Sequence, residues 1–485
     1  MKNMKKIIAL LVVLVVFIAA YILLPKIIKS DDPEESVTPG ASEDSVDLVE
    51  FTRDQMDKLI ITYGDDAYTF TKKDVEVESE SAKDDGTTEI VKKTETRWVT
   101  DDFIANHTAV NDIALSMETV TTKRLIEKDA KDLSIYGLDG SRTLTAHTTG
   151  GAIATIEIGD MTPTSDGYYV KKGDNNDVYT IYSYTGGTLT KSKFDLMSKS
   201  LYGDLVIKDD DMTTLSLTKD GTKVFESKQR AAGGEWQITF PVDRKADYTD
   251  LSKHIQWLNT AAIASFVEES PTDLAQYGLD KPKYVFEYNL RGVNHTLKLG
   301  TLKDSAYYAM FDDMDVVFTV DSTNLTFVDL AVLDLVDTFI YIPMIYDVEK
   351  LVINIDGRTD TMVIDVNQDD STTEKYVFNG TEMATDNQKT MFKRYYQGAI
   401  GFMGERLDLN AVPSGKAFIT LTYTLKQAGD DGKVVTVELI PTPDDYGYYM
   451  VKNKVYSGMI IGKRQLDKAD GGIRTAYQNL VDALK

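Results

Sequence analysis

The chain has 485 residues, with 53 lysines and arginines against 77 aspartates and glutamates, and a formal net charge of −24 at pH 7. So acidic a chain lacks the positive surface that nucleic acids require, which excludes nucleic-acid binding as its expected function. The absence of cysteine excludes disulfides, thiolate nucleophiles, cysteine-ligated zinc, iron–sulfur clusters and a lipoprotein anchor. The length allows about three domains of ordinary size.

A hydrophobic segment near the N-terminus, residues 7–24, contains no charged side chain and follows a lysine-rich start. As a helix it would reach about 27 Å, close to the thickness of the hydrocarbon core of a bilayer. We therefore predict a single-pass anchor in the cell membrane over residues 1–29, with the N-terminus cytoplasmic and the bulk of the chain extracytoplasmic. A cleaved signal peptide is the alternative, because a basic start and an apolar run occur in both.

After this segment, residues 30–47 are rich in acidic residues, Ser and Pro and are predicted to form an acidic flexible linker. Sequence patterns then recur. Residues 132–139, Asp-Leu-Ser-Ile-Tyr-Gly-Leu-Asp, recur as residues 273–280, and Ile-Glu-Ile-Gly at 156–159 recurs as Leu-Lys-Leu-Gly after the same interval. Repetition of this kind indicates related structural units.

A weaker third copy keeps the order of the later strand patterns but lacks the Tyr-Gly-Leu-Asp sequence. Its matching segments are residues 437–440, 447–450 and 455–458. We therefore predict repeat unit one over residues 48–207, repeat unit two over residues 208–345 and a divergent repeat unit three over residues 346–485.

Within a copy, the hydrophobic periodicity changes in a fixed order. Opening strands are predicted at residues 59–63, 215–218 and 351–355, and the polar insertion at 75–96 is interpreted as a longer hairpin or loop. A helix follows, because apolar residues lie three and four positions apart in two segments; these residues are Val110, Ala114, Met117 and Val120, and Leu251, Ile255, Leu258, Ala262 and Phe266.

Further strands joined by short polar turns come next, and they favour antiparallel pairing. In the second copy these strands are residues 284–290, 296–299, 307–311 and 316–320. The apolar residues 324–339 are predicted as a last, core helix. The predicted fold class is α+β, with an N-terminal transmembrane helix followed by three tandem related repeats of antiparallel sheet with flanking helices.

These features together resemble a known bacterial family, the domain of unknown function numbered 4340. The resemblance rests on the anchor, the Asp-Leu-x-x-Tyr-Gly-Leu-Asp pattern, a strand ending in Ile-Gly, a Tyr-Tyr strand, and Trp98 with its counterpart Trp236. It covers most of residues 48–339 and fades in the last copy. Members of the family are often encoded beside ABC-2-type transporter components of the gliding-motility kind, which implies an accessory role at the cell envelope. The resemblance carries over no catalytic residues.

The Tyr-Gly-Leu-Asp motif is the most prominent candidate site. It comprises Tyr136, Gly137, Leu138 and Asp139, and again Tyr277, Gly278, Leu279 and Asp280. An acid beside a tyrosine could bind a cation or a sugar, but we interpret the motif as structural. In that interpretation the glycine supplies a left-handed turn, the tyrosine and leucine fill the core, and the aspartate caps the next turn.

No catalytic, cofactor-binding or metal-ligating residues are predicted. The four histidines, His107, His147, His254 and His295, are scattered without a metal-binding spacing. Acid pairs such as Asp444 with Asp445 could bind calcium, but they lack the alternating pattern of a calcium loop and are interpreted as solvated turns. No nucleophile elbow, phosphate-binding loop or dinucleotide fingerprint occurs.

We therefore expect a non-enzymatic accessory or scaffold module of an ABC-type transporter complex, with permease or related envelope subunits as partners and no cofactor. The alternative is a protein that binds cell-wall glycan or divalent cations through Tyr-rich strands and acidic turns. An envelope hydrolase is a third hypothesis, and it would require a deep pocket with convergent carboxylates.

Overall fold

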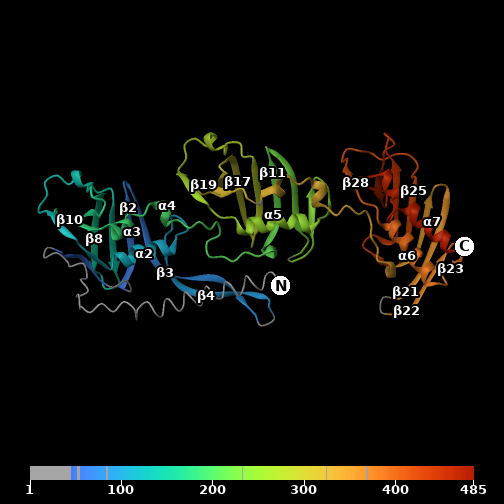
Figure 1. The fold of residues 1–485 in the computed structure, drawn as a ribbon, viewed down its shortest axis with the longest axis horizontal. Helices are drawn as coiled ribbons and strands as arrows, with labels where there is room; N and C mark the ends of the chain where they lie inside the picture. Colours follow the sequence, from blue (N-terminus) through green and yellow to red (C-terminus); the bar gives the residue numbers. More distant parts are fainter. Residues whose placement is uncertain (1–44, 52–54, 84–85, 232, 324, 368–369) are drawn as a thin grey trace, which may run out of the picture. The chain divides into compact units, whose positions relative to one another are not determined.

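The computed structural model describes residues 45–485, except residues 52–54, 84–85, 232, 324 and 368–369 (Figure 1). The predicted anchor, residues 1–29, and most of the predicted linker, residues 30–47, lie outside the described residues. None of the helices in the described part of the chain is both long enough and apolar enough to cross a membrane.

The first part of the chain forms a two-stranded sheet and an eight-stranded sheet, both antiparallel. The small sheet pairs β1 (Asp47–Glu50) with β5 (Thr119–Thr121). The strands of the large sheet, in spatial order, are β4 (Thr88–Val99), β3 (Asp66–Ala82), β2 (Met56–Tyr63), β7 (Thr143–Thr148), β8 (Ile153–Met161), β9 (Gly167–Lys172), β10 (Val178–Tyr182) and β6 (Arg124–Glu127). Three helices accompany them, namely α2 (His107–Ser116), α3 (Ser183–Leu189) and α4 (Lys193–Leu196).

The second large sheet has nine strands and is covered on one face by α5 (Tyr248–Thr260) (Figure 1). Its strands, in spatial order, are β14 (Arg244–Lys245), β13 (Trp236–Phe240), β12 (Thr222–Gln229), β11 (Met212–Lys219), β16 (Tyr284–Leu290), β17 (Val293–Lys303), β18 (Ala306–Phe311), β19 (Val316–Asp321) and β15 (Ser265–Glu269). Leu251, Ile255 and Leu258 lie three and four residues apart on α5 and are buried against this sheet.

The third large sheet also has nine strands, and α6 (Asp386–Ile400) and α7 (Ile473–Ala483) pack on each other beside it (Figure 1). Its strands, in spatial order, are β23 (Thr381–Glu382), β22 (Asp370–Phe378), β21 (Arg358–Asn367), β20 (Val348–Ile355), β25 (Ile419–Gly429), β26 (Gly432–Pro441), β27 (Gly447–Lys452), β28 (Val455–Gly462) and β24 (Arg406–Leu407). Thr385 caps α6, because its side chain accepts a hydrogen bond from the Gln388 amide.

The three large sheets share one pattern of pairing at their centre. In each, the first central strand has an irregularity one residue from its start, so that Lys58, Thr214 and Lys350 occupy the same register position. From there the inward positions alternate with outward positions along β2, β11 and β20. Residues of the three sheets can therefore be matched one by one. Each large sheet has its own buried hydrophobic core.

The chain forms two compact units. One unit comprises the described residues up to 74 together with residues 96–197, and the other comprises the described residues of 75–95 and 198–485. Residues 75–95, which include the end of β3 and most of β4, thus belong to the same unit as the second and third large sheets. The longer hairpin or loop predicted for residues 75–96 is a hairpin.

The predicted fold class is wrong. Where three α+β repeats were expected, the described part of the chain forms four antiparallel sheets, with 47% strand against 20% helix. The coarser expectation of repeated sheet domains holds. Helix was overestimated because an apolar run can cover a sheet without forming a continuous helix.

The segment 324–339 shows the reason for this error. Its described part contains only two short 3-10 helices, η5 (Leu325–Asp329) and η6 (Val332–Leu335). Ala331 is extended between them, and its amide donates a hydrogen bond to the Asp334 carboxylate, which starts a separate turn. The two predicted amphipathic helices are also shorter than expected, because Val120 lies in β5 and Phe266 lies in β15.

Candidate functional site

The two Tyr-Gly-Leu-Asp sequences form closely similar turns. Tyr136 ends a 3-10 helix, η2 (Ser134–Tyr136), and Tyr277 ends another, η4 (Ala275–Tyr277). Each helix is followed by a glycine in the left-handed region, with φ of 67° at Gly137 and 68° at Gly278. Side chains with a Cβ rarely adopt this conformation. The following leucines, Leu138 and Leu279, are buried.

A second glycine explains why each turn occurs together with a glycine-containing strand. The strands do not end at this glycine as the sequence suggested, because Gly159 lies within β8 and Gly300 within β17. A Cβ atom on Gly159 would lie 2.0 Å from the carbonyl oxygen of Tyr136, and one on Gly300 would lie 2.2 Å from that of Tyr277. No side chain fits at such distances. The turn and the strand glycine therefore form one structural element in which the backbone of the turn lies directly against the strand.

The tyrosine hydroxyls of the motif have internal partners. Tyr136 donates a hydrogen bond of 2.7 Å to the Glu127 carboxylate, and Tyr277 donates one of 2.5 Å to the Glu268 carboxylate. The hydrogen bond to Glu268, followed by burial and the charge of that residue, raises the pKa of Tyr277 to about 12. Both hydroxyls are therefore protonated at neutral pH and serve as donors within the fold.

The aspartates of the motif lie after the turn. The Asp139 carboxylate accepts a hydrogen bond from the Ser141 amide, and hydrogen bonding to Ser141 lowers the pKa of Asp139. No internal partner of the Asp280 carboxylate is found among the described residues. Within the described ranges, no group of three or more His, Asp or Glu side chains could hold a metal ion. This geometry suits a structural turn, and the structural interpretation of the motif stays a prediction.

The histidines do not converge on a common site. The Nδ1 atom of His107 accepts a hydrogen bond from the Trp98 amide. His254 is buried, and burial lowers its pKa to about 4. His295 lies 2.7 Å from an Asp312 oxygen. Their different partners indicate local structural roles.

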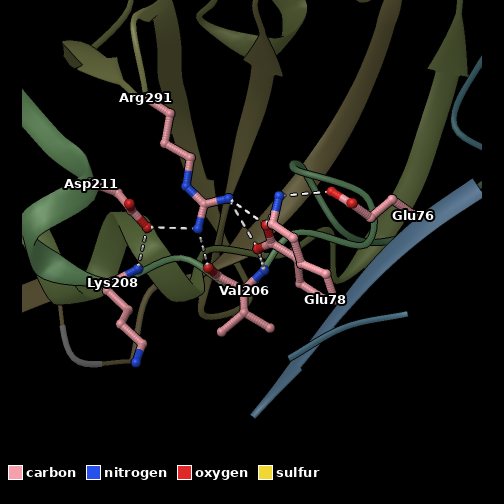
Figure 2. Close-up of polar contacts among 7 residues, drawn as sticks. Glu76, Glu78, Val206, Lys208, Asp211 and Arg291 are labelled. Atoms are coloured by element: carbon pink, nitrogen blue, oxygen red, sulfur yellow. Dashed lines mark hydrogen bonds and ion pairs between the residues drawn. The ribbon is translucent and has the colours of Figure 1, made fainter. Parts of the chain in front are cut away.

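A polar cluster that no sequence pattern indicated lies at residues 75–95 of the β3–β4 hairpin, a segment called the distal hairpin from here on (Figure 2). The Glu78 side chain is only 3% exposed, and both of its oxygens accept hydrogen bonds from Arg291, at 2.9 and 3.0 Å. The Val206 amide donates a third hydrogen bond, of 3.0 Å, to the same carboxylate. The Lys92 ammonium lies 3.6 Å away. Glu78 is therefore an almost fully enclosed carboxylate with several donors around it.

Arg291 connects this carboxylate to the second large sheet. Its guanidinium also donates to the Val206 carbonyl oxygen at 2.8 Å and to the Asp211 carboxylate at 3.0 Å (Figure 2). Burial by itself raises the pKa of Glu78, but hydrogen bonds from Arg291 and Val206 and the charges of Arg291 and Lys92 outweigh it and lower that pKa. The Glu78 carboxylate therefore stays ionised and paired at neutral pH.

No sequence signal singled out this cluster. Glu78 belongs to a run of charged and polar residues that is typical of a solvated hairpin, and Arg291 lies in a two-residue turn before Gly292. Their pairing is a contact between residues far apart in sequence, and single-residue patterns carry no information on such contacts. What the cluster can do is hold the distal hairpin in place; it has no open side at Glu78 on which a substrate could act.

Comparison with known proteins identifies the family. A family model described as a domain of unknown function (DUF4340) matches residues 98–235 and again residues 236–394. The two matches begin at Trp98 and Trp236, the pair expected to correspond. No curated protein matches the chain. No solved structure matches it either. Because the two family matches together span more than half of the sequence, the chain belongs to the DUF4340 family.

Proposed function

We propose that this chain is a non-enzymatic, membrane-anchored extracytoplasmic scaffold that serves as an accessory module of an ABC-type transporter complex. One observation carries the proposal: the enclosed Glu78 carboxylate is used to fasten one part of the fold to another, through Arg291 and the Val206 amide. A fully paired, buried ionic group rigidifies a fold and specifies its arrangement. Rigidity of this kind suits a support for other subunits.

Two further features support a scaffold. The repeated sheet domains have matching strand orders, so the chain offers several separate surfaces built on one plan, as repeat proteins do. The apolar residues 7–24 would tether these domains to the membrane in which transporter subunits reside.

The test is recovery of partners from native membranes. The full-length chain, carrying an affinity tag, is expressed in its own host, cross-linked in intact cells and purified in mild detergent. We expect mass spectrometry to identify ABC permease subunits at near-stoichiometric amounts. A partner-free isolate would contradict the proposal.

Two variants make this experiment specific. Arg291→Met removes the two hydrogen bonds that Arg291 donates to Glu78 and is expected to reduce the recovery of permease subunits. Arg230→Met, at an exposed arginine of the same unit, is the matched control and should leave recovery unchanged. Equal recovery with both variants would show that the cluster does not support partner binding.

A further inference from the structure

The outer faces of the three large sheets differ at one row of matched positions. In the first sheet the row across four strands reads Thr69, Ile60, Thr145 and Thr155. In the third sheet it reads Thr361, Val352, Thr422 and Thr436. In the second sheet it reads Glu226, Ser216, Glu287 and Thr296. Two threonines are thus replaced by glutamates, and the branched apolar residue between them is replaced by a serine.

These replacements create a groove. Residues paired across strands point to the same face, so Glu226 and Glu287 stand on either side of the short Ser216 side chain, which is 7% exposed. The hollow has a volume of about 450 Å³ and is also lined by Thr214, Lys228 and Thr296. That volume lies within the range of small-molecule sites. Ile60 and Val352 fill the same place in the other two sheets.

The lining indicates the chemistry of a ligand. The glutamate Cα atoms are two strand spacings apart, about 10 Å, which leaves room for a ring between the carboxylates. Ser216 donates a hydrogen bond of 3.3 Å to Glu287, and Lys223 donates one to the Oε1 atom of Glu226. The Lys228 ammonium has no hydrogen-bond partner among the described residues. Carboxylate acceptors beside hydroxyl and ammonium donors match a ligand that both donates and accepts.

Three alternatives fit less well. Two carboxylates disfavour an anionic ligand, since like charges repel at short range. The polar walls disfavour an apolar ligand. No third carboxylate or imidazole completes a metal site within the described part of the chain.

We propose that this groove on the second large sheet binds a neutral glycan chain. The inference goes beyond the scaffold proposal and does not depend on it. Glu287 and the second carboxylate oxygen of Glu226, whose first oxygen is held by Lys223, accept hydrogen bonds from sugar hydroxyls, and Lys228 donates to a ring or hydroxyl oxygen. The small Ser216 provides the space in which a sugar ring lies.

Calorimetric titration of the full-length protein in detergent tests the proposal. The probes are soluble hexasaccharides of N-acetylglucosamine, of β-linked glucose and of mannose, and calcium chloride is titrated separately. We expect at least one hexasaccharide to bind at millimolar concentration or below. Ser216→Ile and Glu287→Thr introduce the residues of the first sheet, and each should weaken binding about tenfold or more, as expected for a blocked site or a lost charge-assisted hydrogen bond.

The matched control is Val352→Ile, which changes the same register position in the third sheet and should bind like the natural protein. Melting temperatures and circular dichroism establish that each variant is folded. If Ser216→Ile does not fold, Glu287→Thr still tests the proposal, because it alters an exposed side chain. The proposal is overturned if no hexasaccharide binds, or if Glu287→Thr binds as tightly as the natural protein. The proposal is also overturned if the natural protein binds calcium but no saccharide and Glu287→Thr abolishes the calcium binding.

Discussion

The second and third large sheets share one topology, but they bury chemically different side chains at one matched position. Phe225 pairs with Leu217 in the second sheet, and Asp360 pairs with Ile353 at the matched place in the third. Phe225 packs edge-on against the imidazole of His254, with 5.2 Å between ring centroids. A core position of one sheet is thus aromatic, and the corresponding position of the other is a carboxylate.

The carboxylate is tolerated because its partners are complete. Asp360 is 2% exposed and accepts hydrogen bonds from the Tyr395 hydroxyl at 2.8 Å, from Arg358 at 3.1 Å and from Asn379 at 3.0 Å. Burial, and then the nearby Asp360, raises the pKa of Tyr395 well above its usual value, so its hydroxyl remains a donor. The comparison teaches that this topology accepts a polar core residue where neighbouring elements supply donors.

The largest expected effect comes from breaking the polar core of the third sheet. Asp360→Ala leaves Arg358 and the Tyr395 hydroxyl without their acceptor, and we expect a loss of about 4 kcal/mol. Hydrogen exchange of peptides from residues 348–378 in the full chain would report it. Asp365→Ala, at an exposed acid of the same strand, is the control. Unchanged exchange in Asp360→Ala would show that the paired carboxylate contributes nothing.

A second test concerns the strand glycine of the second sheet. Gly300 matches Ile440 of the third sheet, which lacks the Tyr-Gly-Leu-Asp turn. Gly300→Ala would place a methyl group against the Tyr277 carbonyl, and we expect a cost of about 3 kcal/mol through strain. Urea unfolding followed by tryptophan fluorescence suits the second sheet, which contains Trp236. The matched Ile440→Ala should leave that transition in place, whereas a tolerated Gly300→Ala would show that the turn can move away.

The buried histidine of the second sheet predicts a loss of stability in mildly acidic solution, and the third sheet contains no histidine that could cause the same loss. Burial lowers the pKa of His254 to about 4, below its ordinary value of 6.5. The unfolded chain therefore binds the proton more readily, and stability falls as the pH drops from 6.5 to 4. The loss by pH 4 should reach about 3 kcal/mol. Comparing urea unfolding of the natural protein and of His254→Phe at pH 7 and pH 4 isolates this effect, because all other titratable groups are present in both proteins. Equal pH dependence in the two proteins would contradict the assignment.

The smallest expected effect concerns the hairpin cluster. The turn that contains Arg291 corresponds to a turn with Asp430 and Asp431 in the third sheet. Arg291→Asp, which copies the acidic turn, should repel Glu78 and release the distal hairpin at a cost of about 2 kcal/mol in local opening. Hydrogen exchange in residues 75–95 measures it. Lys281→Asp makes the same charge change at an exposed site of the unit, and equal exchange in both variants would mean that Arg291 does not hold the hairpin.

Several elements were predictable because their signals are local. Alternating burial along β16 and β20, the α5 stripe and the left-handed glycines at 137 and 278 all follow from residues a few positions apart. The association of the Tyr-Gly-Leu-Asp turn with a later glycine was also visible in the sequence, because both patterns recur after the same interval. The helix predicted for 324–339 failed because an apolar run does not distinguish a helix from short turns that cover a sheet.

The sequence alone indicated the opening strands, the helices that became α2 and α5, the glycine turns and the family of this protein. Only the tertiary structure decided which charged residues are buried and which face one another, as with Glu78 and Arg291, or Asp360 and Tyr395. It also decided that Ser216 lies between two glutamates. The physical reason is that burial and pairing depend on contacts between distant segments, and such contacts form only when the sheets assemble.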